Sequence, residues 1–149
     1  SEEDVKFNAA INTAIDSGIK VAWSNDAFEL WVLLHFMEID PKDEKFSTRQ
    51  TYYDLLTDIF KNHKNPNDDL KKAIAHKSFN YKQDLKNKNN FRSIVRPELI
   101  KRTEVAISRA KELERFFNEQ ESPHKKVPCT MVHNLVNELL DLGKKSLEV

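Results

Sequence analysis

Three polar residues, Ser24, Asn25 and Asp26, lie between a short apolar run at residues 19–23 and a longer apolar stretch that begins at Ala27. The short run contains β-branched residues and predicts a strand, and the three polar residues are types that commonly start helices. At such strand-to-helix turns, open α/β sheets bind ligands and helix N-termini favour phosphate. The three residues are therefore a candidate ligand site, and N-capping of the following helix is the simpler alternative.

Two polar side chains, Glu29 and His35, interrupt the apolar stretch at residues 27–37, which predicts a buried helix. A buried Glu29 needs a metal, a cation or an unpaired amide as its partner, unless its capping-box spacing from Asp26 already satisfies it. His35 shares a helical face with Trp31 and could act as a general acid or base. Both are candidate catalytic residues, and the alternative for His35 is a hydrogen-bonded core histidine.

Positive charge gathers between residues 77 and 109, where Lys and Arg outnumber the nearby acids. Phe79, Tyr81 and Phe91 are interleaved with these cations, a pattern typical of surfaces that stack bases and hold phosphates. A solvated loop explains the Lys- and Asn-rich part at residues 80–90 equally well, and a structural salt bridge is the alternative for the last arginine of the set. The candidate nucleic-acid residues are Lys77, Lys82, Lys86, Lys88, Arg92, Arg96, Arg102 and Arg109.

Two other catalytic arrangements are excluded by their residue patterns. Cys129 and His133 are four residues apart, but no acid is evident to orient the histidine and no feature lowers the pKa of the thiol. We therefore reject a cysteine hydrolase. Helical ribonucleases of the HEPN type require an arginine followed a few positions later by a histidine, and no such pair occurs in the chain.

The composition favours a helical protein of the cytoplasm. The 149 residues include only two glycines and a single cysteine, which favours long helices and rules out an internal disulfide. Lys plus Arg and Asp plus Glu both total 24, so only a local patch could bind nucleic acid. No apolar run is long enough to cross a bilayer, which predicts no membrane partner. The start at Ser1, without methionine, suggests that the sequence begins inside a longer protein.

Hydrophobic periodicity and capping residues predict helices at residues 3–17, 27–37, 47–61, 67–74, 97–118 and 132–142. Gly18 and Gly143 are the predicted stops of the first and last helices. In the last helix, Leu135, Leu139 and Leu142 share one face, and their exposure would indicate a docking surface. The single predicted strand, at residues 19–23, cannot form a sheet alone, so we expect its partner strands to precede Ser1.

The segment from Val21 to Phe36 resembles the most distinctive block of the RloB-like family. In that block, a serine-asparagine turn leads into a phenylalanine-glutamate-leucine-tryptophan helix that ends leucine-leucine-histidine-phenylalanine. Weaker family stretches follow in the same order at residues 81–82, 106–111 and 128–133, so the resemblance spans residues 7–140. Asp26 stands where the family usually has proline, and aspartate can start a helix by capping instead.

The resemblance implies a fold that is α/β by origin and predominantly α in this chain. Residues 1–40 would be the C-terminal part of a Toprim-like unit, a helix-strand-helix remnant of its parallel sheet. Residues 41–149 would form a helical bundle packed on that unit. An upstream glutamate and an aspartate pair would bind Mg²⁺ or Mn²⁺ in the full-length protein, whereas this chain alone would bind no metal and would be inactive.

The resemblance further implies a function in bacterial phage defence, of the abortive-infection kind. The full-length protein would be a metal-dependent nuclease that cuts DNA or RNA together with an ABC-type ATPase partner, and this half would shape the nucleic-acid groove. The alternative is a non-catalytic helical interaction module that docks on the ATPase or self-associates. The two hypotheses differ in salt dependence, because only a nucleic-acid groove loses affinity steeply as salt rises.

Overall fold

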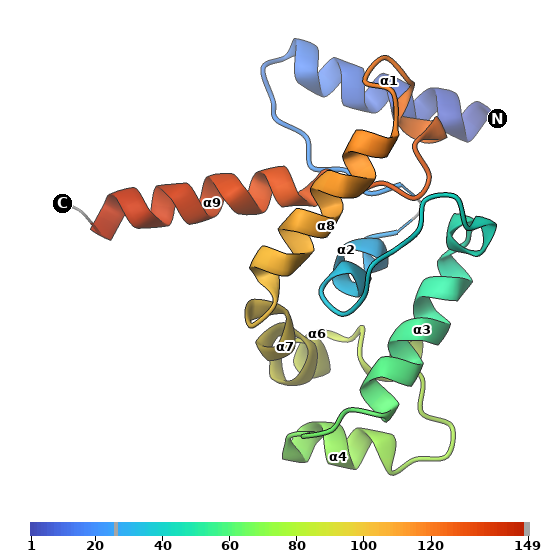
Figure 1. Ribbon diagram of the computed structural model, residues 1–149, viewed down its shortest axis with the longest axis vertical. Helices are drawn as coiled ribbons and strands as arrows, with labels where there is room; N and C mark the ends of the chain where they lie inside the picture. The colour runs from blue at the N-terminus through green and yellow to red at the C-terminus, as the bar shows by residue number, and fades with distance from the viewer. Residues whose placement is uncertain (26, 148–149) are drawn as a thin grey trace.

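A computed structural model describes residues 1–25 and 27–147, and these residues are predominantly helical (Figure 1). The centre of the fold is α2 (Glu29–Leu34), a short helix in which every residue is buried. Two longer helices, α3 (Arg49–Lys61) and α8 (Thr103–Phe116), pack against it. Burial of one large aliphatic side chain contributes about 2 kcal/mol. The buried side chains of α2 therefore form the centre of the core, against which α3 and α8 pack.

The first helix, α1 (Glu2–Asp16), confirms the prediction to within one residue at each end. Ser1 caps it in a capping box with Asp4, and Gly18 adopts a positive φ of 74° just after its end. Glycine adopts this conformation without steric cost, which explains the stop. Ile11 is the buried residue of this helix, so most of its apolar face is uncovered.

The predicted strand at residues 19–23 is not formed. Within the described part of the chain, the only β-pairing is an isolated antiparallel bridge between Ser24 and Thr130. It is extended by hydrogen bonds from the Met131 amide to the Trp23 carbonyl at 2.7 Å and from the Asn25 amide to the Cys129 carbonyl at 2.9 Å. A β-branched sequence makes a strand only where a partner strand binds its backbone groups. The expected remnant of a parallel sheet is therefore absent from the described residues.

The central helix is shorter than predicted and starts differently. It covers Glu29–Leu34 instead of residues 27–37, and residue 28 caps it without a side-chain hydrogen bond. The predicted capping box pairs Glu29 with Asp26, which lies outside the described residues. Beyond α2 the chain continues in turns that begin with a hydrogen bond from the Phe36 amide to the Leu33 carbonyl.

Aromatic rings fill the space between α3 and the segments packed on it. Phe60 of α3 meets Phe36 edge to face, with ring centroids 5.4 Å apart, and stacks on Tyr81 at 6.0 Å. Tyr53, one turn from the start of α3, stacks on the other side of the cluster against Tyr81 at 6.5 Å. The helix was predicted to start at residue 47, and it starts two residues later, with Thr48 at its N-cap and no side-chain capping bond.

The basic stretch at residues 80–90, predicted as a loop, folds into short helices. α4 (Asp68–Ile74) precedes it, capped by Asn67 as predicted. Asparagine side chains at positions 80 and 87 cap α5 (Tyr81–Asp84) and α6 (Lys88–Asn90). From α6 the chain continues through a π-helical turn, η2 (Phe91–Val95), into α7 (Arg96–Ile100). We call the continuous segment from Lys88 to Ile100 the 88–100 helical run.

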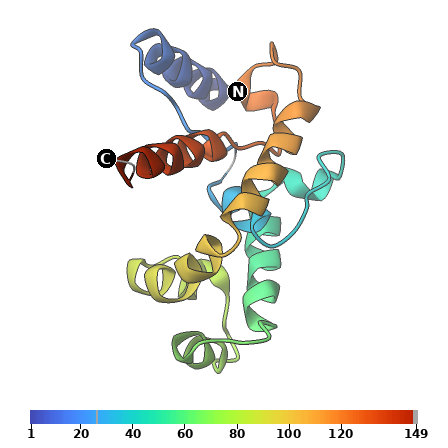
Figure 2. The same cartoon turned by 60° about the vertical axis from the view of Figure 1, so that its left-hand side comes forward.

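The last helix, α9 (Val132–Leu147), runs through Gly143, so the stop predicted there is wrong. No atom lies within 4 Å of the position that a Cβ at Gly143 would take, and nothing at this site opposes a continued helix. α8 and α9 are joined by the 3-10 turn η3 (Pro123–Lys125) and an extended segment. Figures 1 and 2 show α9 projecting away from the rest of the molecule.

The proposed division of the chain at residue 40 stays a prediction. α2 lies before this boundary, and it packs against α3 and α8, which lie after it. Among residues 1–25 and 27–147, no helix is both long enough and apolar enough to cross a membrane.

Candidate nucleic-acid interface

The strand-end residues Ser24 and Asn25 direct their polar atoms toward the segment that precedes α9. Ser24 Oγ lies 2.6 Å from Thr130 Oγ1. The Asn25 amide nitrogen donates to three backbone carbonyls, those of residues 123, 124 and 126, at 2.9, 3.0 and 3.1 Å. Asp26, the third member of the predicted ligand site, lies outside the described residues. In the structure, the Asn25 side chain holds the η3 turn, and Ser24 contacts the segment that leads into α9.

Glu29 has a cation as its partner. Its side chain is buried, and Oε1 lies 2.8 Å from Lys86 Nζ, which also donates to the Tyr53 hydroxyl at 3.1 Å. Burial lowers the pKa of Lys86, but the hydrogen bonds to Glu29 and Tyr53 outweigh burial and raise it overall. The pKa of the nearby Tyr81 phenol is also raised, mainly by burial and then by Glu29. Lys86 is thus already paired with Glu29, although its side chain is 41% exposed.

His35 is a hydrogen-bonded core residue in this structure. It is 3% exposed, its Nδ1 lies 2.8 Å from the Trp31 carbonyl, and its ring packs edge to face on the Trp31 ring. Burial lowers the pKa of the imidazole, and the nearby Arg102 and Arg109 lower it further. The ring is therefore neutral at pH 7, and its Nδ1 carries the proton that is donated to the carbonyl.

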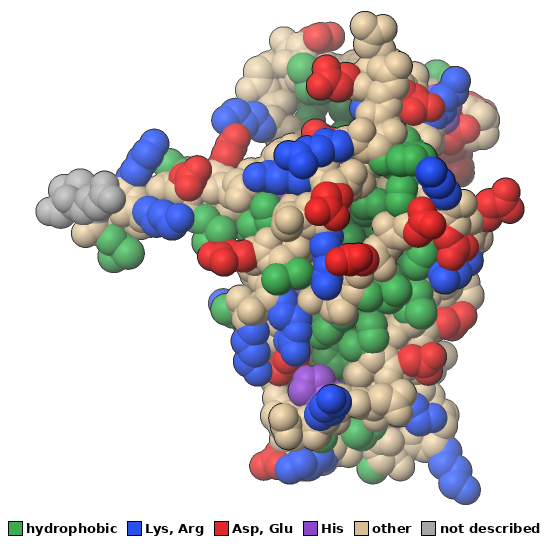
Figure 3. All heavy atoms as spheres, in the orientation of Figure 1, with side chains coloured by type: hydrophobic (Ala, Val, Ile, Leu, Met, Phe, Trp, Pro, Cys, Tyr) green, Lys and Arg blue, Asp and Glu red, His purple; other side chains and the backbone are tan. Residues whose placement is uncertain are grey.

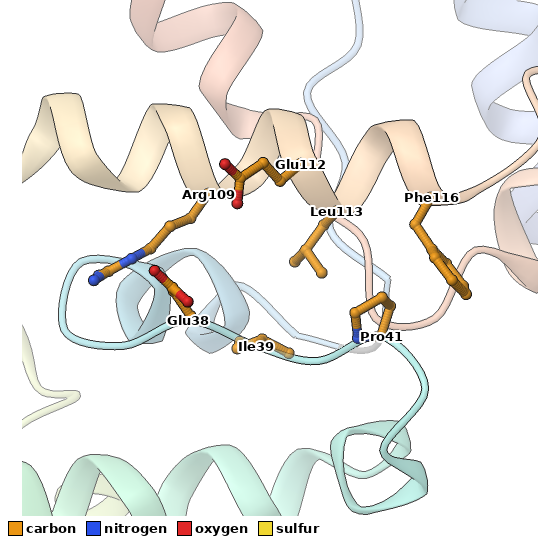
Figure 4. Close-up of a pocket in the computed structure, with 7 residues that line it drawn as sticks. All are labelled: Glu38, Ile39, Pro41, Arg109, Glu112, Leu113 and Phe116. Atoms are coloured by element: carbon orange, nitrogen blue, oxygen red, sulfur yellow. The ribbon is translucent and has the colours of Figure 1, made fainter.

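Arg109 anchors α8 to the C-terminal end of α2. Its Nη1 donates to the Leu34 carbonyl at 2.9 Å, which satisfies one of the carbonyls left free at a helix end. The side chain borders a pocket of about 200 Å³, and Figure 4 shows it at one end with Glu38 and Glu112 while apolar side chains, among them Leu113, line the other end. The two carboxylates make this pocket a poor site for phosphate.

Glu98, which the sequence analysis did not single out, is the centre of the strongest charge cluster. Its carboxylate accepts from Arg102 at 2.6 Å and Lys101 at 2.7 Å, and His63 Nε2 lies 3.3 Å away. Burial raises the pKa of this carboxyl, but the three hydrogen bonds outweigh burial and leave it at about 2. Arg102 also covers the Phe36 ring at 5.2 Å, so this predicted nucleic-acid residue is already engaged by Glu98 and Phe36.

The remaining predicted cations are exposed, and three of them share one helical segment. Lys88, Arg92 and Arg96 follow one another at four-residue spacing along the 88–100 helical run, and none makes an ion pair with any described residue. In an α-helix, four residues correspond to about one turn and about 6 Å along the axis, and the π-helical turn η2, which contains Arg92, is wound more widely. We call these three residues the cationic row. Lys77 is exposed nearby, and Lys82 Nζ lies 5.5 Å from the centre of the Tyr53 ring.

The aromatic residues predicted to stack on bases are largely inaccessible. Phe79 is 6% exposed and Tyr81 is 1% exposed, and Phe91 is only partly exposed. These side chains belong to the core, so any nucleic-acid contact of this surface must be made mainly to phosphates. On the face seen in Figure 3, Lys and Arg side chains are interspersed with Asp and Glu, and the surface does not form one broad basic field.

A second histidine has an acid partner that the sequence analysis missed. His133 is fully buried, its Nε2 lies 2.8 Å from Glu114 Oε2, and its Nδ1 lies 3.1 Å from the Thr130 carbonyl. The statement that no acid orients this histidine was therefore wrong. Rejection of a cysteine hydrolase still follows, because burial and the Glu114 charge raise the pKa of the Cys129 thiol to about 12.

Metal ligands are not clustered in the part of the chain that the structure describes. No group of three or more His, Cys, Asp or Glu side chains there could hold a metal ion.

The sequence of this chain matches the family model described as RloB-like protein over residues 1–139. No curated protein and no solved structure matches the chain significantly.

Proposed function

Because the chain belongs to the RloB-like family, we propose that it is the helical half of a phage-defence protein and that it binds nucleic acid for a nuclease centre outside this chain. That centre would use Mg²⁺ or Mn²⁺ and act with an ATPase of the ABC type. Among the described residues, no group of three or more His, Cys, Asp or Glu side chains could hold a metal ion. Their role in the proposal is to bind and position the nucleic acid.

The cationic row carries this proposal. Lys88, Arg92 and Arg96 are exposed, and none makes an ion pair with a described residue. They are four residues apart, which is about 6 Å along the axis of an α-helix. Successive phosphates of a nucleic-acid strand are separated by a similar distance, so the row can neutralise consecutive phosphates. Because the neighbouring aromatic residues are buried, this contact reads no bases. We therefore expect binding that is independent of sequence and steeply dependent on salt.

The test measures binding of labelled single-stranded and duplex oligonucleotides by fluorescence anisotropy between 50 and 200 mM salt. Over this range, the binding affinity falls about tenfold for every two phosphate contacts. The test variant is Lys88→Gln/Arg92→Gln/Arg96→Gln. We expect it to reduce the slope of log affinity against log salt by about 2 to 3, because three phosphate contacts are lost. A matched control, Lys6→Gln/Lys125→Gln/Lys126→Gln, removes the same charge near α1 and η3. Equal losses in both variants, or none in the first, would contradict the proposal.

A second candidate function, an interaction module, is favoured by the last helix. Leu135, Leu139 and Leu142 are 47%, 58% and 62% exposed and lie on one face of α9. We call these three residues the leucine ridge. Large side chains gathered on one exposed face usually mark a surface that another molecule covers. The ATPase partner and a second copy of the chain are the two occupants that this candidate allows, and binding to either would vary little with salt.

A further inference from the structure

α9 is attached to the body mainly by its first two turns. Val132 and Val136 pack against the core, and His133 is buried against Glu114. All residues from Glu138 to Leu147 are exposed, and Figures 1 and 2 show this part of the helix standing clear of the other elements. The segment at residues 20–22 borders the N-terminal half of the ridge, and the C-terminal half of α9 is open to a second helix.

The leucine ridge has the spacing of a helix-pairing seam. Its members are four and then three residues apart, and Ser146 continues the pattern four residues later. Spacings of four and three residues alternate between the d and a positions of a coiled coil, whose side chains form one stripe along the helix. A small residue at the end of the seam, Ser146, limits the contact to about two heptads.

Charges of opposite sign flank the ridge at equivalent positions. Glu138 and Lys145 are seven residues apart, so they lie on the same side of the seam. Within the chain, Glu138 pairs with Lys20 at 2.7 Å, and both side chains remain largely exposed. Lys145 makes no ion pair with any described residue. One side of the ridge therefore has an acid, Glu138, and a base, Lys145. In two antiparallel copies of α9, the acid of each copy can face the base of the other.

We propose that α9 pairs antiparallel with α9 of a second copy of this chain. Leu139 lies opposite Leu142 of the second copy and Leu142 lies opposite its Leu139, while Glu138 meets its Lys145 and Lys145 meets its Glu138. The order of charges selects the antiparallel arrangement. In a parallel pair, Glu138 would face the partner position of Gly143, which offers no charge. The proposal rests on the second candidate function and names its occupant.

The test uses two charge-reversal variants of the full chain, Glu138→Lys and Lys145→Glu, in sedimentation-velocity and multi-angle light-scattering experiments. Either variant alone puts like charges together at both flanking positions, so we expect its dimer dissociation constant to rise roughly tenfold. In an equimolar mixture, every flanking pair is again of opposite sign. We therefore expect the mixture to form heterodimers with an affinity close to that of the unchanged protein. Glu138→Lys also removes the ion pair with Lys20. This ion pair is missing from that variant both alone and in the mixture, so its loss cannot explain a dimer that recovers on mixing.

Four outcomes decide the proposal. Recovery of the dimer only on mixing, together with a monomeric Leu139→Asp variant, supports it. A protein that is monomeric at every concentration overturns it, and so does a dimer that survives Leu139→Asp. A dimer that both charge variants form as well as the unchanged protein overturns the antiparallel register. Nucleic-acid binding is measured on the same samples, and a Leu139→Asp monomer that still binds oligonucleotides shows that the two functions succeed or fail independently.

Discussion

Glu98 offers the sharpest test of the electrostatics of the fold. This carboxylate is 9% exposed, and it joins α7 to α3 through His63 and the chain after α7 through Lys101 and Arg102. A Glu98→Gln substitution keeps the size of the side chain and removes its charge. We expect the variant to fold, because glutamine can still accept a hydrogen bond from Arg102, but to be less stable at neutral pH.

The magnitude follows from the pKa of Glu98, which falls from 4.5 to about 2 on folding. Such a fall corresponds to about 3 kcal/mol of folding free energy at pH 7. Because the Lys101 and Arg102 side chains are 63% and 36% exposed, water screens their attraction. We therefore expect Glu98→Gln to lose about 2 kcal/mol. A lowered pKa stabilises the fold above pH 4.5, and this contribution disappears as the pH falls from 4.5 toward 2.

Urea unfolding followed by circular dichroism at several pH values measures this contribution. The difference between the native protein and Glu98→Gln should be constant at neutral pH and should shrink steadily once the pH falls below 4.5. Glu112→Gln is the matched control, because Glu112 is exposed and makes no ion pair with a described residue. A difference that is absent at pH 7, or that does not change on acidification, would refute the reasoning.

Three further substitutions test other contacts. Lys86→Met leaves the buried Glu29 carboxylate without its cation and should lower the free energy of unfolding by about 2 kcal/mol, while a second change, Glu29→Gln, should restore much of the loss. Gly143→Ala should raise the stability of α9 by about 0.5 to 1 kcal/mol and increase the helical circular-dichroism signal, since the added Cβ meets no atom. Asn25→Ala should speed tryptic cleavage at Lys125 and Lys126, because three carbonyls there lose their donor.

Each of these expectations has a contradicting result. Equal stability of Lys86→Met and the native protein would mean that the Glu29 carboxylate does not depend on this cation. Destabilisation by Gly143→Ala would mean that α9 ends before this residue. Unchanged cleavage in Asn25→Ala, measured against the exposed control Asn12→Ala, would mean that the η3 turn is held by other contacts.

Local sequence signals predicted several helices well, but the single helix predicted at residues 97–118 is two helices, α7 and α8, and the predicted strand is not formed. α1, α3 and α4 follow from periodicity and capping residues that lie within a few positions of one another. The segment at residues 19–23 has the composition of a strand, but a strand also needs partner strands, and none is found among the described residues. Asn80 and Asn87 were interpreted as loop residues, although each caps a short helix. Asparagine favours both states, and local sequence did not separate them.

Sequence distance decided which contacts of the candidate site could be predicted. Lys101 and Arg102 follow Glu98 by three and four residues, a spacing that indicates an ion pair within one helix. By contrast, Lys86 reaches Glu29, and Glu114 reaches His133, only because separate elements pack together. The sequence therefore groups the candidate cations, and only the fold shows which of them are already paired.

The two proposed surfaces depend on different forces, so they can operate at the same time. Figures 1 and 2 show α9 well separated from α6 and α7, which carry Lys88 and Arg96 of the cationic row. Phosphate binding by the row releases counterions and weakens steeply as salt rises, whereas burial of the leucine ridge does not weaken. In a dimer joined through α9, two cationic rows would act on one nucleic acid, which raises its apparent affinity without any new contact. Raising the salt concentration should therefore release the nucleic acid first and leave the dimer intact.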